Sequence, residues 1–322
     1  MLDSELIRQL HDIVGDDGMR EQELMSELTT FEIGGPAEVV VEPATIQEAA
    51  QVFAACKSSN ARVRVLGLGS DLLVSDAGLD GVVVRFAERF SAISVDPKTA
   101  RLTVEPGASN ADVAEAACAA GLSGYEFASG IPGTIGGAAI MNAGAYGGEF
   151  RNVCSELTCL TPDGEVVRVH AYEACWGYRQ SMMFEAGYVV LGATLQLMRG
   201  DVSEICARMD DLAQQRSSKQ PLEMPSAGST FKRPKGYFAG KLIQDAGLRG
   251  FSVGGAQVSE KHTGFVVNKD GATAADVIAL IKAVQDRVFE NEGVRMYPEV
   301  RMWGFTEAEL SQVSAHGEHA TR

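Results

Sequence analysis

Hydrophobic positions recur with helical spacing in several segments of the chain. Leu6 and Leu10 lie four residues apart near the N-terminus. Thr45 precedes Glu48 by three residues, as in a capping box, and Gly293 follows the last periodic segment, where a C-terminal glycine is expected. The sequence therefore predicts helices over residues 6–14, 45–56, 109–121, 201–216 and 273–292, the fourth with core positions at Val202, Ile205, Met209 and Leu212.

Apolar runs bounded by turn residues predict the strands. Pro162, Asp163 and Gly164 separate two such runs and indicate a hairpin turn. Helix and strand patterns do not alternate regularly along the chain, which favours an α+β fold over a doubly wound parallel sheet. Strands are expected over residues 37–42, 62–67, 82–86, 101–107, 154–161, 165–170, 188–197 and 298–303.

The composition is that of an ordinary globular protein. Of its 322 residues, 45% are hydrophobic and 22% are charged, and the length allows two or three compact units with cores of their own. The formal net charge of −15 argues against nucleic acid or an anionic membrane as the main partner. An anionic small molecule stays compatible with this charge, because a few Arg and Lys side chains reverse the field inside one cleft.

The sequence carries no sign of export or of a metal site. No apolar run approaches the roughly 18 residues that cross a bilayer, and the acidic, amphipathic N-terminus lacks the apolar core of a signal peptide. The six cysteines form no CxxC pair and have no His at ligand spacing, so we expect buried free thiols and no metal. These features predict a cytoplasmic location.

Glycines are dense in two segments, residues 67–72 and 130–147. Such density indicates either close approach of backbone N–H groups to a phosphate or a series of tight turns at packed surfaces. The dinucleotide fingerprint GxGxxG is absent, because Leu72 stands where its third glycine should be. Any dinucleotide would therefore be held by two separate loops, and a long cofactor that spans both is the natural hypothesis.

Six ordered blocks carry a family resemblance. They are GLGSDLLVSDAG, GIPGTIGGAAIMNAGAYGGE, YRQS, KQPLEMPSAGSTFKRP, AGKLIQDAGLRGFSVGGAQVS and PEVR. Together they resemble the UDP-N-acetylenolpyruvoylglucosamine reductases (MurB family), from about Thr30 to Gly304. The resemblance implies that the chain reduces the enolpyruvyl group of a UDP-aminosugar with electrons from NADPH, passed through FAD, in peptidoglycan precursor synthesis.

The resemblance also implies a domain organisation. FAD would bind without a covalent link to a two-part domain of the vanillyl-alcohol-oxidase type, with subdomains at residues 1–86 and 87–200. A C-terminal α/β substrate domain would occupy residues 201–304, with a closing strand near 299–304 able to return to the first subdomain, and a flexible tail would follow at 305–322. The short spacing between Arg179 and Ser229 favours the subtype without a lid insertion.

The flavin-binding residues that the resemblance implies lie mainly in the two glycine-rich segments. No histidine occurs between His11 and His170, so the covalent His tether of some oxidases with this fold is not expected. Cys118 lies in that interval, and its Ala-rich helix favours a core thiol. The expected flavin residues are Gly67, Leu68, Gly69, Ser70, Asp71, Leu72, Gly130, Pro132, Gly133, Thr134, Gly136, Gly137, Ala138, Asn142, Gly144, Ala145, Tyr146, Gly147 and Val190.

Three residues carry the expected chemistry. Enolpyruvyl reduction needs a hydride on one alkene carbon, a proton on the other, and stabilisation of the negative charge that develops between these steps. By resemblance, Ser229 donates the proton and Arg179 faces the substrate carboxylate, where a bidentate donor suits an enolate-like intermediate. Glu299 assists protonation or orients the intermediate. Tyr178, Lys219 and Lys241 are weaker candidates for binding the substrate phosphates or carboxylate.

Two residues depart from the family pattern. Glu32 stands where a basic or neutral residue is commoner, and Asp71 stands where Asn is usual. A carboxylate beside a pyrophosphate is unfavourable unless it accepts backbone N–H bonds. Two alternative functions stay open: another non-covalent flavoprotein oxidoreductase of this fold, and a flavin-binding module without catalysis. The chain is expected to be monomeric.

Overall fold

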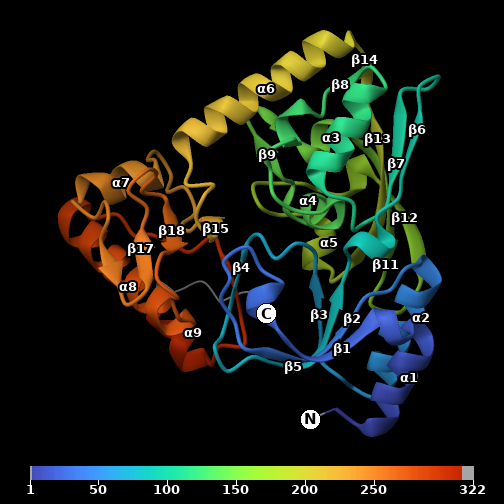
Figure 1. Cartoon of the computed structure of the whole chain (residues 1–322), viewed down its shortest axis with the longest axis horizontal. Coiled ribbons are helices and arrows are strands. Elements are labelled where there is room, and N and C mark those ends of the chain that lie inside the picture. Colours follow the sequence, from blue (N-terminus) through green and yellow to red (C-terminus); the bar gives the residue numbers. More distant parts are fainter. Residues whose placement is uncertain (1, 314–322) are drawn as a thin grey trace. The chain divides into compact units, whose positions relative to one another are not determined.

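The structure is a computed structural model that describes residues 2–313. The chain divides into two compact units, each assembled from separate segments (Figure 1). Unit 1 comprises Met1–Glu21, Val39–Leu68 and Gly81–Arg216, and unit 2 comprises Gln22–Glu38, Gly69–Asp80 and Ser217–Arg322.

The first sheet of unit 1 has the strand order β1-β2-β5-β3. Its strands are β1 (Met19–Leu24), β2 (Pro36–Val41), β5 (Leu79–Arg85) and β3 (Val63–Leu66), with β3 and β5 parallel. Side chains of the sheet share a core with α1 (Ser4–Val14) and α2 (Ile46–Ser58). The Thr45 side chain accepts a hydrogen bond from the Glu48 N–H, so the predicted cap of α2 is confirmed.

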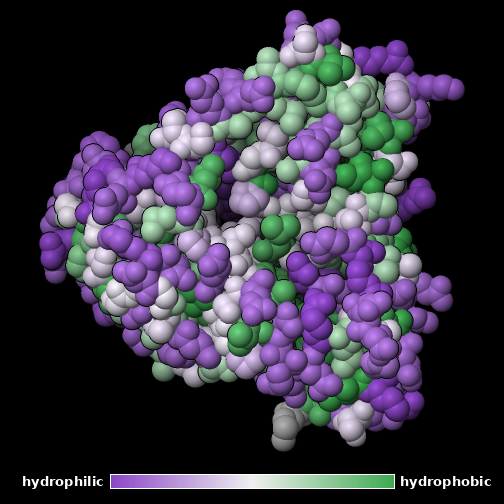
Figure 2. All heavy atoms as spheres, in the orientation of Figure 1, coloured by the Kyte–Doolittle hydropathy of each residue, from purple (hydrophilic) through white to green (hydrophobic). Residues whose placement is uncertain are grey.

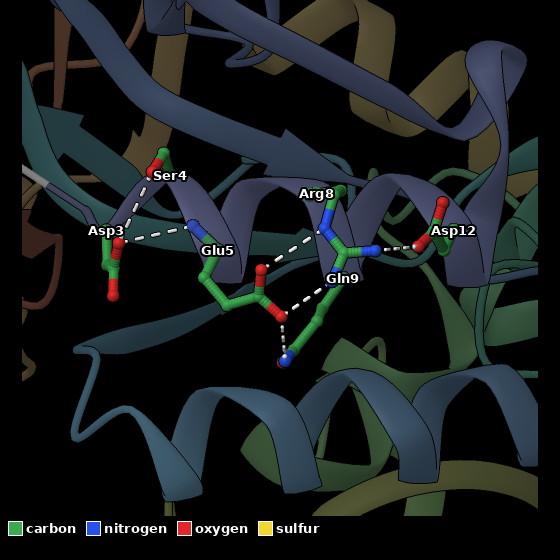
Figure 3. Close-up of polar contacts among 6 residues, drawn as sticks. All are labelled: Asp3, Ser4, Glu5, Arg8, Gln9 and Asp12. Atoms are coloured by element: carbon green, nitrogen blue, oxygen red, sulfur yellow. Dashed lines mark hydrogen bonds and ion pairs between the residues drawn. The ribbon is translucent and has the colours of Figure 1, made fainter.

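Polar side chains stabilise α1 along its exposed face (Figure 3). Asp3 caps the helix by accepting a hydrogen bond from the Glu5 N–H at 3.2 Å. Arg8 donates to Glu5 one turn before it and to Asp12 one turn after it. These i,i+3 and i,i+4 pairs are the spacings at which charged side chains meet on a helix, while Leu6, Leu10 and Val14 are buried.

The second sheet of unit 1 is antiparallel and has the order β12-β11-β13-β7-β6. Its strands are β6 (Ile93–Asp96), β7 (Arg101–Val104), β11 (Cys154–Leu160), β12 (Val166–His170) and β13 (Val189–Gln196). The helices of this half are α3 (Asn110–Ala119), α4 (Ile135–Met141), α5 (Met182–Glu185) and α6 (Val202–Lys219). Two short pairs complete it, β8 (Leu122–Ser123) with β14 (Met198–Arg199) and β9 (Gly144–Ala145) with β10 (Gly148–Glu149).

Unit 2 contains an antiparallel sheet of order β15-β18-β17-β16. Its strands are β15 (Ser226–Ser229), β16 (Ser252–Val253), β17 (Ala256–Val258) and β18 (Phe265–Asn268), and its helices are α7 (Ala239–Asp245), α8 (Ala274–Glu292) and α9 (Glu307–Val313). A parallel pair joins β4 (Leu72–Val74) to β19 (Arg301–Trp303). Short 3-10 helices occur in the chain at Asp16–Gly18, Met25–Glu27, Glu88–Phe90, Glu126–Ala128, Phe150–Asn152 and Ala171–Glu173.

Several expectations need correction. Val202 is 45% exposed, because it lies in the first turn of α6, while Ile205 and Leu212 are buried as predicted. Cys118 and Cys206 are not free thiols, since they form a disulfide with each other, and the free thiol Cys175 is exposed rather than buried. Where a flexible tail was expected to begin, the chain forms α9, whose Val313 is buried; residues 314–322 of that expected tail lie outside the described residues.

The helices and strands together confirm the α+β class. Hydrophilic side chains cover most of the face shown in Figure 2. Among residues 2–313, no helix is long and apolar enough to cross a membrane.

Candidate active-site residues

The second glycine-rich segment, residues 130–147, is fixed by the start of α3. The Asn110 N–H donates to the Gly133 carbonyl at 3.0 Å, and its side-chain amide donates to the Ile131 carbonyl at 3.2 Å. The Tyr125 hydroxyl donates to the Asn110 side chain at 2.8 Å. Burial raises the pKa of Tyr125, so its hydroxyl stays a neutral donor. The loop is thus held by a buried polar network whose groups have partners.

The glycines of the two segments serve different purposes. A Cβ atom at Gly67 would collide with the Thr134 hydroxyl, and one at Gly148 would collide with the Phe127 ring, so these glycines allow close packing within unit 1. A Cβ atom at Gly147 would meet nothing within 4 Å, and one at Gly137 would meet only the Thr134 hydroxyl at 3.8 Å. Packing therefore does not explain Gly137 and Gly147, which leave open backbone that fits close approach of a cofactor.

The pair β9–β10 forms a hairpin in which Tyr146 and Gly147 are the two turn residues. Both have positive φ, 52° and 86°, as a type I′ turn requires. Arg216, from the last turns of α6, packs its side chain against Gly130 and forms a hydrogen bond with the Tyr146 side chain. Burial lowers the pKa of Arg216, and Tyr146 acts in the opposite direction.

Sequence reasoning missed Arg216. A signal for it was present, because Ile205, Met209, Leu212 and Arg216 follow helical spacing on one face of α6. The residue that continues an apolar stripe toward a glycine-rich loop is a candidate for contact with that loop.

Asn142 connects the second glycine-rich segment to the turn that carries Arg179. It ends α4 in the left-handed conformation with a φ of 45°, and its side chain is buried. The side-chain amide donates to the Gly177 carbonyl at 3.2 Å and to Glu149 at 2.9 Å. Trp176 also donates its indole N–H to the Ala139 carbonyl at 2.7 Å. The turn at 176–180 is therefore fixed to α4 and to the loop that follows it.

Arg179 and Tyr178 lie together in this turn. A bridge between Gly177 and Gln180 closes it, and Arg179 adopts a positive φ of 55°. The Arg179 guanidinium lies over the Tyr178 ring, 5.0 Å from its centroid. A non-glycine residue with positive φ costs backbone energy, and such residues often occur at functional sites.

In unit 2, Gly69 of the first glycine-rich segment is connected to the strand of Ser229 through Thr30. The Thr30 N–H donates to the Gly69 carbonyl at 3.3 Å, and the Thr30 hydroxyl donates to the Ser226 carbonyl at 2.7 Å. Gly69 has a φ of 63° and lies against the backbone of Leu28 and Thr29, where a Cβ atom would clash. Close packing therefore requires glycine at position 69.

Ser229 and Glu299 are brought together by strand pairing. Ser229 ends β15 opposite Phe265, next to an irregularity at Gly228, and it is exposed. The Glu299 N–H donates to the carbonyl of Thr230 at 2.8 Å, and the Thr230 N–H donates to the Gly264 carbonyl at 2.9 Å. Glu299 itself is buried. An exposed hydroxyl and a buried carboxylate thus lie on neighbouring backbone segments.

Comparison with known proteins supplies the identification. Residues 37–170 match the family model of the FAD binding domain, and residues 220–303 match that of the UDP-N-acetylenolpyruvoylglucosamine reductase C-terminal domain. Enzymes named UDP-N-acetylenolpyruvoylglucosamine reductase are 50% identical in Agathobacter rectalis and 48% identical in Clostridium beijerinckii. These matches cover 89% and 87% of this chain and 94% and 91% of the relatives. The chain belongs to the UDP-N-acetylenolpyruvoylglucosamine reductase family.

A solved member of the family has a similar structure. The crystal structure of the enzyme from Thermus caldophilus matches with a TM-score of 0.77 and 35% identity, over 88% of this chain and 99% of that one. The reductase is thus an FAD-dependent oxidoreductase of peptidoglycan synthesis that acts on a UDP-sugar, which confirms the expected family, fold class and cofactor.

One of the two departures from the family pattern, Asp71, has a local explanation in unit 2, whereas nothing in the structure explains the carboxylate of Glu32. The Asp71 carbonyl accepts a hydrogen bond from the Arg301 N–H at 2.9 Å. Burial lowers the pKa of Arg301, and the nearby Asp71 carboxylate acts against this shift, so the two charges interact favourably. Glu32 has a φ of 54°, and its carbonyl accepts a hydrogen bond from Asn268 at 3.4 Å. The Asp71 charge therefore has a cation close by.

The remaining candidates have diverse surroundings. Lys219 is the last residue of α6 and is exposed. Lys241 forms an exposed ion pair with Asp245 at 2.7 Å, which weakens the case for it as a phosphate ligand. The Val190 side chain is buried, and its carbonyl lies 3.6 Å from where a Cβ atom of Gly136 would be, so β13 lies against the second glycine-rich segment.

Proposed function

We propose that this reductase takes its electrons from NADPH and converts UDP-N-acetylglucosamine enolpyruvate to UDP-N-acetylmuramate with Ser229, Arg179 and Glu299 as its catalytic residues. The observation that carries the proposal is the hydrogen bond from the Glu299 N–H to the carbonyl of Thr230. It holds the backbone of Glu299, whose side chain is buried, next to that of Thr230, the residue that follows the exposed Ser229. This neighbourhood supports a proton donor and a helper at one site.

Ser229 protonates the carbon next to the carboxylate in this proposal. A serine hydroxyl is a weak acid in water, so it needs a positive environment. The sequence between Glu223 and Lys241 contains no acidic residue and three basic ones, Lys232, Arg233 and Lys235. In a chain with 43 acidic residues, this local excess of cations favours the anion that remains when the proton leaves Ser229.

Arg179 binds the substrate carboxylate and stabilises the negative charge that develops there. Its guanidinium presents parallel N–H donors to a planar anion. The hydrogen bond from Asn142 to Gly177 and the stacking on Tyr178 limit its motion, so little reorganisation is needed during the reaction. Tyr178, Lys219 and Lys241 assist substrate binding in the same proposal.

FAD, when bound, supplies hydride transfer from its N5 atom to the substrate. The residues proposed to hold it are the two glycine-rich segments together with Asn142 and Val190. The open backbone at Gly137 and Gly147 and the left-handed conformation at Tyr146 support this assignment. We also propose FAD-binding subdomains at residues 1–86 and 87–200, a substrate domain at residues 201–304, and a cytoplasmic location. The protein is proposed to be a monomer, which size-exclusion chromatography with light scattering would test.

An anaerobic absorbance experiment tests the proposed function. Purified protein should show flavin bands, which NADPH should bleach and UDP-N-acetylglucosamine enolpyruvate should then restore. Bands that bleach and do not recover would contradict the substrate assignment and keep the flavoprotein. Replacing NADPH with NADH in the first step tests the choice of donor, since a faster reduction by NADH would contradict it.

A further inference from the structure

One covalent link of unit 1 has no part in the reaction described above. Cys118 near the end of α3 and Cys206 in the first half of α6 form a disulfide, with 6.3 Å between their Cα atoms. The other four cysteines, Cys56, Cys154, Cys159 and Cys175, are free. Cys118 is buried, whereas Cys206 is exposed. A small reductant therefore reaches this bond from the Cys206 side.

The attachment of α6 to unit 1 depends on few side chains. Of its eighteen residues only Ile205 and Leu212 are buried, and Met209 packs partly against the same core. Its start is held where β14 pairs with β8 (Figure 1). A helix with so little buried apolar surface gains little from packing. The disulfide is therefore a large part of what fixes α6 to α3.

The two helices joined by the disulfide both contact the second glycine-rich segment, α3 through its first residue and α6 through its last turn. Asn110 at the start of α3 donates hydrogen bonds to the carbonyls of Ile131 and Gly133. Arg216 near the end of α6 packs on Gly130 and bonds to Tyr146. The loop, α3, the disulfide, α6 and Arg216 thus form a closed ring of contacts. Opening the ring at the disulfide leaves the Arg216 contact dependent on a weakly packed helix.

We propose that the Cys118–Cys206 disulfide is a redox-controlled link that stabilises the second glycine-rich segment. Its reduction by a dithiol then lowers the affinity of the protein for FAD. This inference rests on the proposed role of residues 130–147 in holding FAD. A thiolate of the dithiol bonds to the Cys206 sulfur, and the S–S bond breaks with Cys118 as the leaving thiolate. The second thiol of the reagent then releases Cys206, so the protein gains two electrons and two protons while the dithiol becomes a cyclic disulfide.

A reducing compartment would make this disulfide a redox-sensing element. In a reducing cytoplasm, which is the proposed location, disulfides are uncommon and those that occur are usually transient and catalytic or redox-sensing. Coupling between two sites is reciprocal. If reduction weakens FAD binding, bound FAD must make the disulfide harder to reduce by the same factor.

The experiment measures the dissociation constant of FAD for the apoprotein by flavin fluorescence, before and after dithiothreitol under argon. Thiol titration of the denatured protein should find the four free cysteines before reduction and all six afterwards. Couplings of this kind typically change affinity 5–150-fold, so we expect the dissociation constant to rise roughly tenfold. The midpoint potential of the disulfide should then fall by about 30 mV when FAD is saturating, which is the same tenfold factor for a two-electron couple.

Two variants serve as controls. Cys118→Ser with Cys206→Ser should bind FAD as weakly as the reduced protein and should not respond to dithiothreitol. Leu157→Ala removes a buried side chain of β11 from the same core and leaves the disulfide in place, so it should lower the melting temperature and leave FAD affinity within about twofold. If the double variant does not fold, the wild-type titrations and the potential shift still decide the matter.

Three outcomes would overturn the inference: six titratable thiols in protein purified under air, an unchanged FAD dissociation constant after confirmed reduction, or an equal loss of FAD affinity in Leu157→Ala. Failure of the oxidised protein to bind FAD at all would instead contradict the proposed role of the glycine-rich segments.

Discussion

The two units position their proposed reactive residues in different ways. In unit 1 the turn of Arg179 is held by side chains that reach across loops, from Asn142 to Gly177 and from Trp176 to Ala139. In unit 2 the backbone itself places Ser229 and Glu299, through the pairing of β15 with β18 and the Glu299–Thr230 hydrogen bond. Ser229 should therefore tolerate side-chain changes without moving its backbone, whereas the Arg179 turn depends on individual side chains.

The sharpest test of this comparison is Ser229→Ala in unit 2. The backbone of β15 should be unchanged, so the variant should fold and bind FAD normally. Loss of the proton donor should slow sugar-dependent reoxidation by about 10²–10⁴-fold. Stopped-flow absorbance measures the two half-reactions separately. An unchanged reoxidation rate would show that Ser229 is not the donor.

Arg179→Lys in unit 1 is the matching change and should have the next largest effect. Lysine keeps the charge but loses the bidentate geometry, so reoxidation by the sugar should slow by about 10²–10³-fold. Reduction by NADPH should keep its rate, because no substrate carboxylate is involved in that step. An equal slowing of NADPH reduction would show instead that the change disturbs the turn, and it would contradict the specific role of Arg179 in carboxylate binding.

Two glycine variants separate packing from cofactor approach inside unit 1. Gly67→Ala should lower the free energy of unfolding of the apoprotein by about 1–3 kcal/mol, because the new methyl group meets the Thr134 hydroxyl. Gly137→Ala lies in α4 beside open space and should stabilise the apoprotein by up to about 1 kcal/mol. It should nevertheless weaken FAD binding about tenfold, equivalent to about 1.4 kcal/mol. Urea unfolding and flavin fluorescence measure the two quantities, and unaltered FAD binding in Gly137→Ala would remove that residue from the proposed site.

The smallest expected effect is on stability and concerns the loop of unit 2 that carries His262 and Gly264 and bonds to Thr230, the residue after β15. His262 accepts a hydrogen bond from the Gly264 N–H at 3.1 Å, and Gly264 in turn accepts one from Thr230. Burial, with a smaller contribution from Arg249, lowers the pKa of His262. The unfolded chain therefore binds a proton more readily than the folded protein as the pH falls below about 6.5.

The free energy of unfolding should consequently decrease from pH 7 to pH 5, and His262→Gln should make this decrease shallower. Urea titrations at several pH values measure both slopes. Identical slopes in the variant and the wild type would mean that His262 contributes nothing to the pH dependence.

Local signals in the sequence predicted the regular elements well. The cap at Thr45 and the left-handed Gly293 appear as expected, because capping depends on residues within one turn of each other. The helix α4 inside the glycine-rich segment was not predicted, since Gly136 and Gly137 disfavour helices and only tertiary packing supports one there. Pairings such as β4 with β19 join residues more than two hundred positions apart, and no local pattern encodes them.

The sequence by itself determined the family and the α+β class, because motifs and periodicity are local properties of the chain. It also supplied the residues that we propose for the chemistry. Only the tertiary structure decided which glycines leave open backbone, that Arg216 reaches Gly130 and Tyr146, and that Cys118 meets Cys206. It also decided that the backbone of Glu299 bonds to that of Thr230, the residue after Ser229. Each of these is a contact between distant segments, and such contacts arise from the packing of whole elements, which the spacing of residues along the chain does not record.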